Sequence, residues 1–212
     1  MTPKIISLLS DGIDSPVAAY LMMKKGFVPV FLTFITTNFQ QEQMENKIHK
    51  IAQRLRHFSN KELKLYIVPF TANLAQIVKN CTRKLTCILC KRLMYRIAIQ
   101  LADKEGTNFI LTGDILGEQA SQTLSNLRSY QSIFRNHIKI SPLIGLNKMD
   151  VTEINKEIGV YEICAEKLES CQFYPQYPET NVKLSELQHA EELLNWDNLV
   201  DITIERAKII KI

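Results

Sequence analysis

The sequence of 212 residues contains no apolar run that approaches the ~20 residues needed to span a membrane. It also shows no positively charged N-terminal segment followed by a cleavable apolar stretch, which argues against a secretory signal peptide. Internal repeats and low-complexity segments are absent as well. These absences argue against integral membrane, secreted and repeat proteins, so we expect a soluble, cytoplasmic protein with no membrane partner.

The composition suits one globular unit. Hydrophobic residues make up 46% of the chain, which is enough for one substantial core. The net charge of +4 is mildly basic and permits a nucleic-acid partner without requiring one. The five cysteines are an odd number, so metal or redox chemistry is favoured over a framework of disulfides.

The N-terminal residues read as a strand, a turn and a helix. Ile5 to Leu9 form a short, branched apolar run that is typical of a buried parallel strand. Apolar residues return at helical spacing after Ser15, and this pattern stops at Gly26. The turn is Ser10-Asp11-Gly12-Ile13-Asp14-Ser15, called the 10–15 loop below. Backbone N–H groups and the helix dipole at such a turn favour an anion, although the Lys-Ser/Thr of a Walker A loop is absent.

Strands and helices alternate along most of the chain, which predicts a parallel sheet covered on both faces. The predicted strands span 5–9, 27–34, 63–69, 108–112 and 138–143, the later predicted helices span 41–58, 72–79, 89–105, 118–124, 150–157 and 182–195, and 197–212 is of uncertain type. We assign residues 1–165 to an α/β nucleotide-binding domain and 166–212 to a C-terminal extension packed on the same unit. Ligands of such sheets lie beyond the carboxyl ends of the strands, so Ser10, Phe34 and Gly113 are expected at one crevice.

The 10–15 loop resembles the S-G-G-x-D-S signature of the PP-loop ATP pyrophosphatases, which adenylate a substrate and release pyrophosphate. Two later motifs extend the resemblance: Cys87-Ile88-Leu89-Cys90-Lys91-Arg92-Leu93-Met94, and the run from Leu111 to Leu127 that begins Leu-Thr-Gly-Asp. Together they are similar to the catalytic domain of the ThiI family, which makes 4-thiouridine in tRNA, over about Lys4 to Leu184. The resemblance implies a doubly wound α/β fold of the adenine nucleotide alpha hydrolase-like class, with a parallel five-stranded sheet.

The same resemblance implies which residues bind ATP. The ends of the first two strands correspond to positions that hold adenosine, and Asp14 suits a Mg²⁺ ion bridging the phosphates. Lys91 supplies a cation for the phosphate charge, and these two residues with Cys171 are the expected catalytic group. The full predicted nucleotide set is Leu8, Leu9, Ser10, Gly12, Asp14, Ser15, Thr33, Phe34, Lys91, Gly113 and Gln122. A buried strand or a solvated helix would also explain several of these residues without ATP.

Three cysteines form the predicted metal site. Cys87 and Cys90 have C-x-x-C spacing, which is a weak signal for a metal by itself. Cys171 begins an aromatic segment that resembles the family loop with an essential cysteine, and in archaeal-type members such a set holds an iron–sulfur cluster with one open iron site. Two alternatives remain open: a structural zinc site completed by Cys81 or Cys164, and a Cys87–Cys90 redox disulfide or inert buried thiols.

The chain departs from the family pattern in two ways. Asp11 stands where the family loop has its first glycine. Aspartate adopts positive φ more readily than most residues, and Mg²⁺ or Lys91 is expected to offset its charge. Family members also carry an N-terminal tRNA-binding region, whereas this chain begins at the first catalytic strand, so we expect a separate tRNA-binding subunit or a homodimer.

These features favour an ATP-dependent tRNA sulfurtransferase that makes 4-thiouridine through an adenylated base. Its expected cofactors are ATP, Mg²⁺ and an iron–sulfur cluster, with zinc as the alternative metal, and the sequence does not indicate the sulfur donor. Two other functions remain open. One is adenylation of another acceptor, such as a sulfur carrier in thiamine-type biosynthesis, and the other is a non-catalytic nucleotide-binding subunit.

Overall fold

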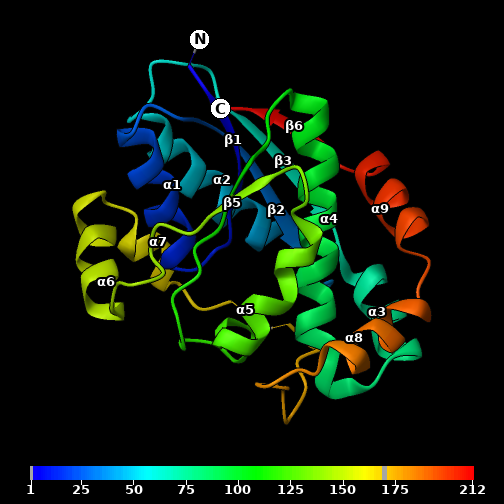
Figure 1. The fold of residues 1–212 in the computed structure, drawn as a ribbon. Helices are drawn as coiled ribbons and strands as arrows, with labels where there is room; N and C mark the ends of the chain where they lie inside the picture. The colour runs from blue at the N-terminus through cyan, green and yellow to red at the C-terminus, as the bar shows by residue number, and fades with distance from the viewer. Residues whose placement is uncertain (1, 169–170) are drawn as a thin grey trace.

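A six-stranded sheet runs through the centre of the molecule (Figure 1), and its strand order is β5-β4-β1-β2-β3-β6. The computed structural model describes residues 2–168 and 171–212. The strands are β1 (Lys4–Leu8), β2 (Val28–Ile35), β3 (Lys64–Pro69), β4 (Phe109–Leu111), β5 (Ile138–Ile140) and β6 (Lys208–Lys211). In these described ranges no helix has both the length and the apolar character needed to cross a bilayer.

Helices cover both faces of the sheet, so the predicted doubly wound α/β fold is confirmed. They are α1 (Asp14–Lys24), α2 (Gln41–Arg56), α3 (Thr71–Asn80), α4 (Thr86–Glu105), α5 (Leu124–Tyr130), α6 (Lys148–Glu157), α7 (Tyr161–Ala165), α8 (Leu184–Glu192) and α9 (Trp196–Glu205). One face carries α1, α2, α6 and α7, and the other carries α3, α4, α5, α8 and α9 (Figure 1). Each face has its own hydrophobic core cluster.

The central strands are apolar on both sides because both of their faces are covered. Ile5 of β1 belongs to one core cluster and the next residue, Ile6, belongs to the other, and both are fully buried. Ile6 pairs in parallel with Val30 of β2 and with Ile110 of β4. The strands that hold the 10–15 loop therefore lie at the middle of the sheet, where packing from two sides fixes their position.

The structure differs from the sequence prediction in two places. The predicted five-stranded sheet gains a sixth strand, β6, which pairs antiparallel with β3 at the sheet edge. The helix predicted over 118–124 is wrong: a turn and a short 3₁₀ helix, Ala120–Gln122, occupy this stretch, and α5 begins only at Leu124. The side chain of Thr123 accepts a hydrogen bond from the N–H of Asn126 and so caps the N-terminus of α5.

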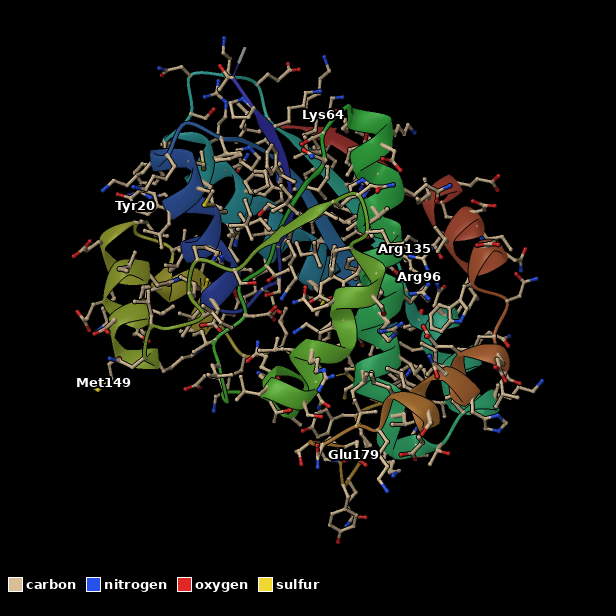
Figure 2. The ribbon with its side chains drawn as sticks, in the orientation of Figure 1. Tyr20, Lys64, Arg96, Arg135, Met149 and Glu179 are labelled. Atoms are coloured by element: carbon tan, nitrogen blue, oxygen red, sulfur yellow. The ribbon has the colours of Figure 1, made fainter. Side chains whose placement is uncertain are left out.

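A buried carboxylate joins the amino ends of two strands to the end of α4. Glu105 accepts hydrogen bonds from Lys64 at 2.7 Å, Lys4 at 2.9 Å and the hydroxyl of Tyr66 at 2.7 Å, and Figure 2 shows Lys64 beside this end of the helix. Burial raises the pKa of Glu105, but the hydrogen bonds from these three side chains outweigh it and hold that pKa at about 2.

We expect Glu105→Gln to lower the free energy of unfolding by about 1–3 kcal/mol at neutral pH, because it removes the negative partner of two lysines. The folded pKa of about 2 lies below the unfolded value of about 4.3. The stabilisation is therefore present above the unfolded pKa and is lost as the pH falls through the folded one. Urea unfolding at several pH values in this range measures the free energy of unfolding of variant and wild type, and the difference between the two should narrow as the pH falls.

The matched control is Glu62→Gln, which removes an exposed carboxylate that pairs with Lys211 at 3.2 Å. Both of those side chains are well exposed, so the control should change stability by less than about 0.5 kcal/mol. Equal effects of the two variants, or a Glu105→Gln effect that does not change with pH, would contradict this account.

Candidate functional site

The 10–15 loop closes on itself through two serines. The N–H of Ser10 donates to Oγ of Ser15 at 2.8 Å, and the two serine hydroxyls lie 3.0 Å apart. No described non-glycine residue has a positive φ, and Gly12 is also outside that region. The expectation that Asp11 relies on a positive φ is therefore wrong, because this turn needs no left-handed residue at either position.

The charge of Asp11 is met by a lysine that the sequence analysis missed. Lys47 of α2 donates to Oδ2 of Asp11 at 3.2 Å, to the carbonyl of Cys164 at 3.1 Å and to the carbonyl of Glu166 at 2.7 Å. Its side chain is only 3% exposed. In this structure Lys47, rather than Lys91, balances Asp11, and it also ties the 10–15 loop to the segment after α7.

A cavity of about 210 Å³ opens beyond the carboxyl ends of β1 and β2. The residues predicted to hold adenosine meet there: its lining includes Leu8, Leu9, Ser10, Thr33 and Phe34. The walls are mostly apolar side chains, and Ser10 belongs to the 10–15 loop. A flat, largely apolar group in this cavity would place an attached phosphate chain beside the N–H groups of that loop.

Gly113 lies against the start of α1 rather than at this cavity's wall. A Cβ at position 113 would be 2.9 Å from the backbone nitrogen of Ser15 and 3.0 Å from the carbonyl carbon of Asp14. The glycine is therefore required by a close approach of two backbones, and its contact with a nucleotide stays a prediction. Of the three residues predicted to meet at one crevice, Ser10 and Phe34 line the cavity, whereas Gly113 contacts the start of α1.

Asp114 follows Gly113 and forms the centre of a polar cluster. Its carboxylate pairs with Lys91 at 2.5 Å and with Lys139 at 2.8 Å. Burial raises the pKa of Asp114, but the charges of Lys91 and Lys139 hold it well below its usual range. Its other hydrogen-bond partners are Thr112, Tyr95 and Gln122. Asp114 and Lys139 were missed by the sequence analysis, although the Thr-Gly-Asp of the third motif pointed to the first of them.

Gln122 reaches this cluster from the 3₁₀ helix that precedes α5. Its Nε2 lies 3.4 Å from Oδ1 of Asp114, and its Oε1 is buried without a hydrogen-bond partner in the described part of the chain. A buried amide oxygen without a partner costs free energy, so it suits a donor supplied by a ligand. Lys91 and Gln122, which were both predicted to contact the nucleotide, thus meet at Asp114.

Asp14, the predicted Mg²⁺ ligand, lies at the first turn of α1 and pairs with Lys148 at the start of α6. Its side chain is 21% exposed, so the carboxylate remains accessible from solvent. A Mg²⁺ ion at Asp14 would have to displace the ammonium group of Lys148. The magnesium role of Asp14 stays a prediction, and Lys148 is a further residue that sequence patterns did not reveal.

All five cysteines are free thiols, so the structure contains no Cys87–Cys90 disulfide. Burial, and then the charge of Cys171, raises the pKa of Cys87 to about 11 and raises the pKa of Cys90 further. Cys164 packs in the opposite core cluster, which removes it from this group, and Cys81 donates to a backbone carbonyl of α8.

Among the described residues no three His, Cys, Asp or Glu side chains are placed so that they could hold a metal ion. The charge of Cys171 nevertheless raises the pKa of Cys87 and of Cys90, and Lys91 and Arg83 favour the thiolate of Cys87. The donor set is therefore chemically suited to a thiophilic metal or cluster, and the assembled geometry stays a prediction.

The family model described as "Thiamine biosynthesis protein (ThiI)" matches residues 1–196. The chain belongs to the ThiI family. This confirms the resemblance that was read from the three motifs. The 10–15 loop, the cavity at the ends of β1 and β2 and the Asp114 cluster all lie within the region that the ThiI family model matches.

Curated relatives align with this ThiI chain along nearly its whole length. A probable tRNA sulfurtransferase from Methanosarcina mazei is 35% identical over 213 residues, which cover 99% of this chain and 52% of the relative. A second probable tRNA sulfurtransferase, from Methanocaldococcus jannaschii, is 38% identical over 193 residues, which cover 89% of this chain and 49% of the relative. The chain therefore spans about half the length of the curated relatives it matches.

Two solved structures share this fold and differ in how similar their sequences are to this chain. A crystal structure of a 4-thiouridine synthetase–RNA complex with bound ATP matches with a TM-score of 0.94 and 34% identity, covering 99% of this chain and 55% of that one. A U34-tRNA thiolase from Methanococcus maripaludis matches 96% of this chain and 71% of its own with a TM-score of 0.54 at 17% identity, which shows a shared fold.

We expect Gly113→Ala to destabilise the protein by about 1–3 kcal/mol, because its Cβ would overlap backbone atoms that cannot rotate away. Hydrogen exchange of the Ser15 amide should rise at the same time. The control is Gly145→Ala, where a Cβ meets nothing within 4 Å. That variant should be neutral or gain up to about 1 kcal/mol. A Gly113→Ala protein as stable as the control would refute the close approach.

A double-mutant cycle on Asp11 and Lys47 tests the ion pair between the half-buried carboxylate and the buried lysine. Lys47→Met should cost about 2–4 kcal/mol, since it leaves one carboxylate and two carbonyls without their donor. Adding Asp11→Asn should recover about 1 kcal/mol relative to the sum of the single effects. Thermal and urea unfolding give these values, and Lys50→Met, an exposed lysine of the same helix, is the control. Strictly additive effects would show that the pair is not coupled.

Proposed function

We propose that this chain is the ATP-dependent catalytic part of a tRNA sulfurtransferase that converts a uridine of tRNA into 4-thiouridine. One observation carries the proposal. The cavity at the ends of β1 and β2 adjoins the 10–15 loop, in a chain whose fold matches a 4-thiouridine synthetase bound to RNA and ATP with a TM-score of 0.94.

ATP would bind with its adenosine part in the cavity and its phosphates at the 10–15 loop. Leu8, Leu9, Thr33 and Phe34 supply the largely apolar walls. The N–H groups at the start of α1 and the helix dipole would favour the phosphate charge. Mg²⁺ would exchange with Lys148 at Asp14, and the released ammonium group would then be free to meet a phosphate oxygen.

The reaction would proceed in two displacements. The O4 oxygen of the uridine attacks the α-phosphorus of ATP, so an O–P bond forms and the bond to pyrophosphate breaks. A sulfur nucleophile then attacks C4, and AMP leaves with the oxygen. The residues of this chain would act by orienting the two reactants and by stabilising charge on the phosphates. Lys91, which pairs with Asp114 in this structure, is the lysine that we propose for the phosphate charge.

Cys87, Cys90 and Cys171 would hold an iron–sulfur cluster, with zinc as the alternative metal. Such a cluster, when bound by three thiolates, supplies an open iron site that binds sulfide. The raised pKa of Cys87 and Cys90 means that both thiols lose protons when they bind metal, so metal uptake would release acid. Lys91 and Arg83 assist by favouring the thiolate of Cys87.

The partner of this site would be tRNA, presented by a separate tRNA-binding subunit or by a second copy of the chain. The reaction would take place in the cytoplasm, where tRNA and ATP meet. The sulfur donor is left open. Adenylation of a small acceptor or a sulfur carrier is a distinct outcome of the experiment below.

Purified protein with ATP and Mg²⁺ should release pyrophosphate when an unmodified tRNA transcript is added, and with a sulfide source the tRNA should gain 4-thiouridine. Cys171→Ser should keep pyrophosphate release and lose at least about tenfold in thiolation, because only the second displacement needs that sulfur. Cys81→Ser is the matched control and should keep both activities, since the Cys81 thiol donates to the carbonyl of Ala190 and is not one of the three proposed cluster ligands.

Pyrophosphate release with a small acceptor but not with tRNA would refute the tRNA assignment. ATP binding without any adenylation, even in Asp11→Gly, would refute an enzymatic role. The metal content is measured after anaerobic purification. Iron with acid-labile sulfide is expected, and Cys171→Ser should contain less of both. Zinc without sulfide would rule out the cluster.

A further inference from the structure

A second cavity, of about 460 Å³, lies on the outer side of α4. Three arginines line it: Arg92 and Arg96 from α4, and Arg135 from the segment between α5 and β5. Figure 2 labels Arg96 and Arg135, which lie close together beside that helix. This cavity is separate from the one at the ends of β1 and β2, whose lining shares none of these residues.

Arg92 forms the rigid floor of this arginine cavity. Its Nε and Nη2 bind the two carboxylate oxygens of Glu191 at 2.8 Å each, and its Nη1 donates to the carbonyl of Ser129. The residue is 4% exposed. Each of the three guanidinium nitrogens makes a hydrogen bond, so Arg92 holds Glu191 in place and contributes a positive charge at a fixed position.

Arg96 is one helical turn further along α4 and is only partly satisfied. Its Nη2 donates to Glu191 at 2.9 Å, and its guanidinium lies 4.6 Å from the ring centroid of Trp196. Its Nη1 is buried and has no hydrogen-bond partner in the described part of the chain. This unpaired donor of a charged group costs free energy in the present arrangement, and a turn of the Arg96 side chain toward the cavity would let it bind an anionic oxygen.

The rim of the arginine cavity adds free donors. Arg135 is exposed and makes no hydrogen bond or ion pair with any residue that the structure describes, and Ser132 and Gln188 are also exposed on this rim. Three guanidinium groups thus face a single carboxylate, Glu191. The lining of the cavity therefore carries a positive net charge, and its exposed rim holds the donors that a ligand would meet first.

A neighbouring cavity limits the direction in which a charged polymer can pass. Beyond Arg96 and Ile99 it is lined by Asp103, Asp197 and Asp201. These carboxylates would repel a second phosphate on that side. A phosphate chain seated in the arginine cavity would therefore leave it past Arg135 and not past α9.

We propose that the arginine cavity binds a phosphate of an RNA backbone, and thus gives the tRNA a second point of attachment outside the ATP site. The inference rests on the proposed function for its ligand, because RNA supplies phosphodiesters that reach an open, positively charged cavity. Arginine suits this ligand since its planar guanidinium binds two phosphate oxygens at once. Arg135 would close on the phosphate, and Nη1 of Arg96 would supply the buried donor.

The test measures binding of an unmodified tRNA transcript to wild type, Arg135→Gln and Ser132→Asp over a range of salt concentrations. Losing one phosphate contact should lower the slope of log K against log salt by about 0.8 and weaken binding about fivefold at about 0.1 M salt. Ser132→Asp, which puts a carboxylate on the rim, should weaken binding at least as much. Lys25→Gln is the control, because it removes one exposed charge beside α1 on the opposite face.

Trp196 provides a second readout, since it is the single tryptophan and stacks on Arg96. The transcript should change its emission in wild type and much less in Arg135→Gln. Inorganic phosphate is the comparison ligand and should produce the change only at millimolar or higher concentration. A response to phosphate at low concentration, with tRNA binding insensitive to Arg135→Gln, would mean a site for free phosphate and would overturn the proposal.

The remaining outcomes separate this site from the proposed function. If the protein thiolates tRNA but Arg135→Gln keeps the wild-type slope, the arginine cavity is not an RNA contact and the function stands. If tRNA binds with the expected dependence on Arg135 but is never adenylated, the site stands and the function falls. If wild type does not bind the transcript at all, the site is refuted.

Discussion

Gly113 and the first residues of α1 approach each other with no side chain between them. A Cβ on the glycine would lie 2.9 Å from the nitrogen of Ser15, so the two backbones meet at about the closest distance that packing allows. Gly113 follows β4, and α1 follows β1, which is the neighbouring strand. This contact therefore sets the spacing between the 10–15 loop and the Asp114 cluster. The two halves of the candidate site are positioned by the sheet before any ligand arrives.

Every carboxylate of the site is already paired with a lysine from another element. The pairs are Asp11 with Lys47, Asp14 with Lys148, and Asp114 with Lys91 and Lys139. A nucleotide with its metal ion would thus exchange partners with these lysines instead of entering a site of uncompensated charge. Such preorganised charges need little rearrangement when phosphate charge moves, which is the property that phosphoryl chemistry requires.

The sequence was sufficient for features whose signals are local. The central parallel strands were predictable because their apolar runs are buried on both faces, and the 10–15 loop because a strand, a turn and a helix follow one another directly. β6 was not, since its four residues carry no turn signal and pair with β3 from far along the chain. The lysine partners of the aspartates were not predictable either, because they lie far away in the sequence: Lys47 is 36 residues from Asp11, and Lys148 is 134 residues from Asp14.

The bond from Lys47 to the carbonyl of Glu166 has a consequence for the reach of Cys171. Five residue steps separate Glu166 from Cys171, and a fully extended chain advances at most about 3.5 Å per residue. While Lys47 holds Glu166, the thiol of Cys171 is confined to a sphere of roughly 20 Å around that anchor. Within that limit Cys171 packs against the core cluster on the α4 side of the sheet, so a short stretch of chain links the lysine beside the 10–15 loop to the face that carries Cys87 and Cys90.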